Sequence, residues 1–108
     1  LRSLFLMAYP RIVHHFGAHT YIKETHIDAG TILPKHKHSF DHLSVLVSGS
    51  VLLTVDDESR AITGYTTLKI EAGKAHTVSA LTDVIWLCIH ATDETDPEKV
   101  DHVLIKEH

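Results

Sequence analysis

Short hydrophobic segments recur along the middle of the chain, separated by turn residues, and helical periodicity is mostly absent. This pattern is typical of an all-β sandwich or barrel. Segments rich in Val, Ile, Leu, Thr and Tyr predict strands at residues 20–28, 43–48, 50–56, 60–63, 67–70, 76–80 and 84–91. Turns are expected at Gly30, Gly49, Gly64 and Gly73 and at the Asp56-Asp57 and Thr82-Asp83 pairs. No repeat or linker interrupts these segments, so they predict one compact set of antiparallel hairpins.

The two ends of the chain follow different patterns. Asp96 as an N-cap, Pro97 in a first turn and apolar residues at helical spacing predict a short C-terminal helix. Residues 103–105 would serve equally well in a strand. The apolar stretch at residues 4–13 needs covering, either by the barrel end or by a second subunit, so a homodimer is expected.

Length and composition limit the possible functions. A chain of 108 residues is the size of one domain, with its core at about residues 20–91. The net charge of −4 and the three arginines argue against a nucleic-acid surface, which needs clustered positive charge. The apolar run at residues 4–8 is far shorter than the ~20 residues that span a bilayer. No membrane partner is expected, and the default location is the cytoplasm.

Histidine is unusually frequent, at 11 of 108 residues. His36 and His38 are two positions apart, so an extended strand turns both side chains to one face. His42 stands at the start of the next apolar strand, and His76 starts a later one after a glycine turn. In an antiparallel barrel these four imidazoles can meet at one end of the interior and hold one divalent metal ion.

The spacing of these residues resembles the two motifs of the cupin superfamily, over roughly the central half of the chain. Gly30, His36, His38, His42 and Gly49 fall at the places of the first motif, with His42 where the family usually has Glu. The second motif keeps a glycine and the histidine, as Gly73 and His76, but Glu71 and Ala80 replace its Pro and Asn. The resemblance implies an all-β double-stranded β-helix, a jelly-roll barrel in which these four histidines are metal ligands.

A histidine at position 42 is similar to the four-histidine subset of small bacterial cupins. This resemblance favours Mn or Fe, although imidazole also suits Zn, Ni and Cu. It implies a small-molecule metalloenzyme, with dioxygenase-like or Lewis-acid lyase or isomerase chemistry. Two alternatives stay open: a non-catalytic domain that binds or senses a small ligand, and a structural module with a closed zinc site. Because neutral imidazoles leave the charge of the ion uncompensated, an anionic small organic ligand is favoured.

Further residues have candidate roles around this site. Asp41 is an alternative carboxylate ligand, ranked lower because neighbouring strand residues face opposite ways. Candidates for the wall of a substrate pocket are His26, Phe40, Trp86 and His90, with core packing the stronger interpretation for Trp86. No general acid, base or nucleophile is identified. The lone Cys88, within an apolar run, is interpreted as a core residue.

Overall fold

The computed structural model describes residues 10–38 and 40–106, with side chains except at 34–38 and 101–106. Most of the apolar stretch at residues 4–13 lies outside this range, so the expected homodimer stays a prediction. None of the described helices has the length and apolar character needed to cross a membrane.

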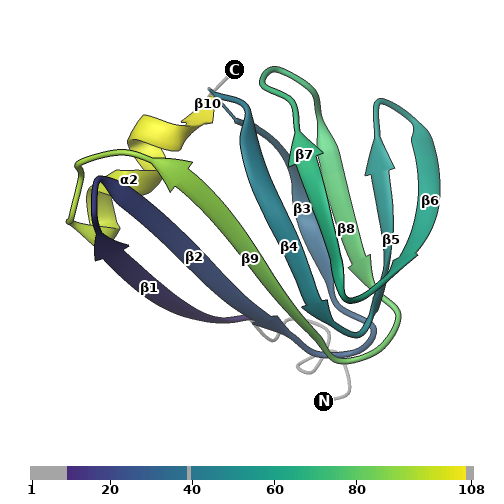
Figure 1. The fold of residues 1–108 in the computed structure, drawn as a ribbon. Coiled ribbons are helices and arrows are strands. Elements are labelled where there is room, and N and C mark those ends of the chain that lie inside the picture. Colours follow the sequence, from purple (N-terminus) through teal and green to yellow (C-terminus); the bar gives the residue numbers. More distant parts are fainter. Residues whose placement is uncertain (1–9, 39, 107–108) are drawn as a thin grey trace, which may run out of the picture.

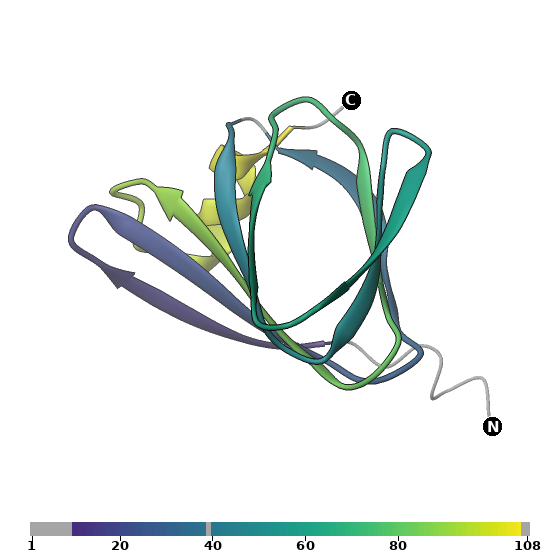
Figure 2. The same ribbon diagram turned by 45° about the vertical axis from the view of Figure 1, so that its right-hand side comes forward.

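Two five-stranded antiparallel sheets face each other (Figure 1). The first has the order β1 (Arg11–Gly17), β2 (Thr20–Ile27), β9 (Val84–Ala91), β4 (His42–Ser48), β7 (Thr66–Ile70). The second has the order β10 (Ile105–Lys106), β3 (Ile32–His38), β8 (His76–Ala80), β5 (Ser50–Val55), β6 (Glu58–Thr63). Strands distant in sequence are neighbours in both sheets, and the sheets curve around a common interior (Figure 2). The predicted all-β barrel is confirmed.

The barrel closes because alternate residues on its strands are apolar and point inward. On β4, Leu46 is fully buried while Leu43 and Val47, on the other face, are exposed. The side chains of the main core come from both sheets: Ile27, Leu46, Val51, Leu53, Ile62, Leu68, Val78, Ala80, Val84 and Trp86. Burying a large aliphatic side chain contributes about 1.5–3 kcal/mol, so this cluster is the main source of stability.

Strand β1 was not predicted from the sequence. It pairs with β2 along its whole length, from Arg11 opposite His26 to Gly17 opposite Thr20. Most of its residues are exposed, so it lacks the hydrophobic alternation that marks the other strands. Ala18 and His19, both with φ in the left-handed region, close the hairpin as a primed turn requires.

The C-terminal segment contains both of the elements that its sequence allowed. The helix α2 spans Pro97–Leu104 and is followed at once by β10, which pairs with β3. Asp96 is the N-cap, because its Oδ1 accepts a hydrogen bond from the Glu98 amide at 2.9 Å. Val100 of the helix is fully buried in a small cluster with Tyr21, to the side of the main core.

Gly49, in the turn between β4 and β5, is required by the geometry there. Its φ is +93°, and a Cβ would come 2.2 Å from the carbonyl oxygen of Asp83. Gly30 also has a positive φ, but open space surrounds the place of its Cβ. Close approach of the two loops therefore adds a second constraint at Gly49 that Gly30 lacks.

Candidate metal centre

The described candidate ligands lie at one end of the barrel. His42 is the first residue of β4 and His76 the first of β8, and their side chains are 5% and 6% exposed. The last part of β3, which carries His36 and His38, reaches the same end (Figures 1 and 2). Two buried imidazoles from facing sheets therefore lie at one end of the interior.

The backbone register connects β3 to this end. His36 is the direct partner of His76 across the β3–β8 ladder, after an irregularity that follows Leu33. His38 is the partner of Ile105 on β10. The side chains of His36 and His38 lie outside the described set. Within that set, no three His, Cys, Asp or Glu side chains form a metal-binding group.

The ring of His42 packs against that of a second buried histidine. Its ring centroid is 4.3 Å from that of His90, with 34° between the ring planes. His90 is 5% exposed, and its other neighbour is Tyr21, at 6.1 Å between ring centroids. Burial, with smaller contributions from His42 and Lys23, lowers the pKa of His90 to about 4. His90 is therefore neutral near pH 7.

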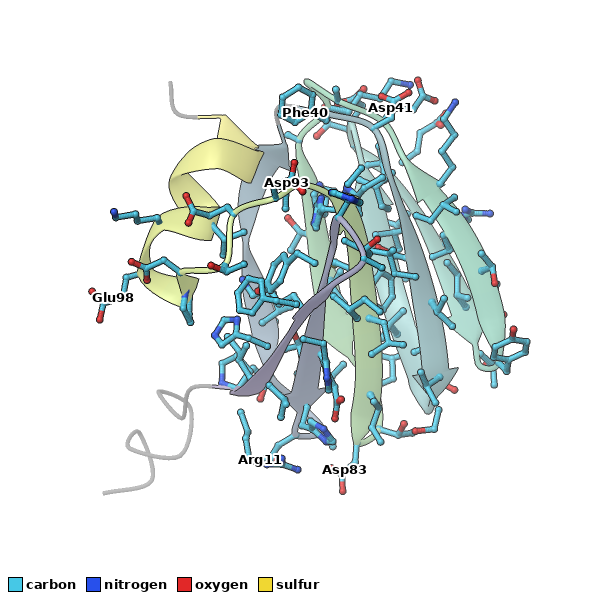
Figure 3. All side chains as sticks on the ribbon, turned by 60° about the vertical axis from the view of Figure 1, so that its left-hand side comes forward. Arg11, Phe40, Asp41, Asp83, Asp93 and Glu98 are labelled. Atoms are coloured by element: carbon cyan, nitrogen blue, oxygen red, sulfur yellow. The ribbon has the colours of Figure 1, made fainter. Side chains whose placement is uncertain are left out.

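Asp41 performs a different task from metal binding. Its Oδ1 accepts a hydrogen bond from the Ala72 amide at 2.8 Å, and its Oδ2 lies 3.6 Å from Lys69 Nζ. The Ala72 hydrogen bond is the main reason why the pKa of Asp41 falls below its ordinary value. The side chain is 55% exposed at the rim of the barrel (Figure 3). These contacts argue against Asp41 as a metal ligand.

A cavity of about 630 Å³ adjoins His76. Its apolar wall includes Leu53, Val55 and Ile70, and Ile70 is the ladder partner of His42. The charged residues Glu58 and Arg60 of β6 line it as well. Pockets for small organic ligands have volumes of roughly 300–1,000 Å³, so this cavity has the size for such a molecule.

The predicted pocket residues lie in four different places. His90 adjoins the candidate ligand His42, and Trp86 packs in the main core at 4% exposure. Phe40 is 57% exposed at the barrel rim, near Asp41 (Figure 3). His26 lies on the outer face of β2 and hydrogen-bonds Glu24, with 2.5 Å between Nε2 and Oε2. Of these four residues, His90 is in contact with a described candidate ligand, His42.

Arg60 is a cavity residue that sequence reasoning missed. Glu58, Arg60 and Ile62 alternate along β6, so they share one face, and Ile62 is buried in the main core. The alternation is visible in the sequence, but only the burial of Ile62 shows which of the two faces of β6 points inward. Arg60 is therefore on the inward face of β6 and lines the cavity, although its side chain is exposed to solvent there.

The donor set fits a divalent transition metal. Neutral imidazole is a common ligand of such ions, and two imidazoles are buried here at the opening of the barrel. The neighbouring neutral His90 adds no positive charge that would repel a cation. The residues present therefore agree with the metal that the motif spacing implies.

Comparison with solved structures identifies the fold. A cupin superfamily protein from Desulfitobacterium hafniense is 17% identical, covers 77% of this chain and 79% of its own, and gives a TM-score of 0.66. A cupin 2 domain-containing protein from Halorhodospira halophila is 16% identical. The match covers 87% of this chain and 75% of that protein, with a TM-score of 0.70. The KdgF protein of Halomonas sp. is 20% identical, covers 74% of each chain, and gives 0.63.

Sequence comparisons give no further information. No family model matches the chain, and no curated protein matches it in sequence. The similarity to solved structures, including one from Methanocaldococcus jannaschii described as an RmlC-like cupin with a double-stranded β-helix fold, shows the fold alone. The chain has the cupin fold, as the resemblance of its motifs implied.

Proposed function

We propose that this protein binds one divalent metal ion through His36, His38, His42 and His76 and acts on a small organic molecule beside it. The observation that carries the proposal is the burial of His42 and His76 at one end of the barrel. The backbone register of His36 with His76 supports it. The cupin fold supports it in general terms, because a metal site at this position is common among proteins of this fold.

Mn or Fe is the favoured ion, on the basis of the resemblance to four-histidine cupins. An ion that prefers six ligands keeps two positions open beyond four imidazoles, whereas tetrahedral zinc would be closed. When bound, such an ion supplies a Lewis acid or a site for dioxygen. The cavity beside His76 has room for a small substrate next to the proposed ion.

Residues of the chain prepare this site in two ways. His90 packs against the ring of His42 and restricts its orientation, as residues around a metal site commonly do. The four proposed ligands are neutral, so the charge of the ion is balanced by no protein ligand, and an anionic ligand is favoured. A glutamate in place of His42 would remove one unit of that charge.

The proposal is tested by loading metal-free protein with Mn²⁺ and following binding by electron paramagnetic resonance. One Mn²⁺ per chain with exchangeable water ligands is expected in the wild type, and loss of the tight site in His42→Ala. His42→Glu should retain Mn²⁺ but bind azide more weakly, because its carboxylate offsets positive charge. Failure of the wild type to bind Mn²⁺ or Fe²⁺ would contradict the proposal.

Measuring oxygen uptake then distinguishes between the possible activities of the metal-loaded protein. Consumption of dioxygen by the Fe²⁺-loaded protein with a small organic acid or diketone supports oxygenase chemistry. Turnover without oxygen supports a lyase or isomerase. Ligand binding without turnover supports a sensing domain, and a tetrahedral zinc site without exchangeable water supports a structural module.

A further inference from the structure

The cavity beside His76 is lined by one arginine, Arg60, together with the acidic residues Asp56 and Glu58. Arg60 lies on β6 and its face of the strand is the inward one, since Ile62 on the same face belongs to the main core. Among the described residues, no carboxylate lies within ion-pairing distance of Arg60. The two lysines that line the same cavity have acidic partners: Lys69 lies 3.6 Å from Asp41 and Lys74 lies 3.5 Å from Glu71.

Strand pairing fixes how Arg60 sits relative to the candidate metal centre. Leu53 on β5 is the partner of Arg60 on one side and of Val78 on the other. Strands are spaced about 4.8 Å apart, so the backbone of Arg60 lies roughly 10 Å from that of β8. His76 is two residues from Val78 on that strand and shares its inward face. Glu58 is in register with His76 through Val55, so Arg60 lies one inward position further along β6. A molecule of a few carbon atoms therefore spans the apolar floor of Leu53 and Val55 between His76 and Arg60.

The chemistry at the two ends of this path is complementary to a dianion. A guanidinium presents paired N–H donors that match a carboxylate in a bidentate arrangement. At the other end, the metal ion with neutral imidazole ligands favours an anionic oxygen. The wall between the two ends is apolar and includes Leu53 and Val55, which suits a short hydrocarbon chain.

We infer that Arg60 binds a carboxylate of the ligand, and that the ligand is a short organic acid with a second oxygen-based anionic group for the metal. This inference rests on the proposed function for the metal end of the cavity. Glu58, two residues from Arg60 on the same face, lines the cavity beside it. Its negative charge disfavours ligands with a third acidic group at that place.

The test measures binding of malonate, succinate and glutarate by isothermal titration calorimetry to Mn²⁺-loaded protein. Monomethyl succinate is the matched probe with a single carboxylate. At least one diacid is expected to bind tenfold or more tightly than that probe in the wild type. Arg60→Gln should remove this difference while keeping one Mn²⁺ per chain, and Arg60→Lys should restore part of it, since Lys keeps the charge but not the paired donors.

Arg11→Gln is the matched control. Arg11 lies at the end of the barrel opposite Phe40 and Asp41 (Figure 3), so the same loss of charge there should leave diacid binding unchanged. Three results would overturn the inference. Arg60→Gln could leave diacid affinity unaltered, or Arg60→Gln and Arg11→Gln could lower it equally. The wild type could also bind no diacid more tightly than monomethyl succinate.

Failure of the proposed function gives a different result. If the wild type takes up no metal, the proposed function fails, and the diacids are titrated into the metal-free protein instead. Binding that depends on Arg60 there supports the carboxylate site without the metal, and binding that does not depend on Arg60 overturns it. If the protein binds one Mn²⁺ per chain and diacid binding does not depend on Arg60, the inference fails while the proposed function stands.

Discussion

The inward positions of β4 change from His42 to Leu46 within four residues, and those of β8 change from His76 to Ala80. Both strands thus join an apolar half of the interior to a half that carries imidazoles. The apolar half is where side chains from both sheets form the main core. One set of strands therefore separates the two tasks, with packing at one end and candidate chemistry at the other.

The largest effect is expected in the apolar half. Leu46 is fully buried and Leu43, on the same strand, is 51% exposed. Leu46→Ala should lower the free energy of unfolding by about 3–5 kcal/mol, because it leaves a cavity in the core. Leu43→Ala should cost less than about 1 kcal/mol. Urea denaturation measures both, and equal losses would show that the two faces of β4 do not differ as described.

Substitutions in the glycine turns should lower the free energy of unfolding by a smaller amount. Gly49→Ala combines a left-handed φ with a clash against the Asp83 carbonyl oxygen, so a loss of about 2–4 kcal/mol is expected. Gly30→Ala meets only the strain of its positive φ, which costs about 1 kcal/mol. Thermal unfolding of the two variants under identical conditions compares them. A larger loss at Gly30 would refute the role given to the close approach at Gly49.

Cys88 lies on β9, between the two halves of the interior. Burial is the main cause that raises the pKa of its thiol, and Ser44 Oγ donates a weak hydrogen bond to Sγ at 3.5 Å. The thiolate is the reactive form, so iodoacetamide at pH 8 should label the native protein at least about tenfold more slowly than the urea-unfolded chain. Mass spectrometry follows the labelling. Equal rates would mean that the interior is open at this depth.

The smallest effect is expected on the outer face of β2. Glu24 accepts hydrogen bonds from His26 and His15, and these lower the pKa of its carboxyl group, His26 contributing most. A lowered folded-state pKa gives stability above the unfolded pKa and loses it as the pH falls. The stability difference between the wild type and Glu24→Gln should therefore be largest above about pH 5 and shrink toward pH 3. Urea midpoints across this range measure it, and a difference that grows in acid would contradict the assignment.

Most of the fold could be predicted from the sequence because hydrophobic alternation marks strands that bury one face. The edges of β2, β5 and β9 fall within about two residues of the expected ones, as alternation arguments allow. β1 could not be predicted, since its residues are mostly exposed and it exists through pairing with β2. Local sequence carries no signal for that pairing.

The sequence predicts the positions of some residues of the candidate site but not the contacts between them. His42 and His76 could be placed because each follows a turn and opens an apolar strand. The packing of His90 against His42 depends on the register of β9 against β4, in which Leu43 meets Ile89. The inward direction of Arg60 likewise depends on which face of β6 joins the core. These contacts follow from long-range pairing, which spacing along the chain does not reveal.

Metal content tests the central claim most directly. Elemental analysis is carried out on wild-type protein purified without an affinity tag or chelator and on His36→Ala, His76→Ala and, as a control on the outer face, His15→Ala. The account predicts about one Mn or Fe ion per chain in the wild type and in His15→Ala, and its loss in the other two variants with their fold retained by circular dichroism. A wild type without stoichiometric metal even after reconstitution, or full metal content in both His36→Ala and His76→Ala, would contradict it.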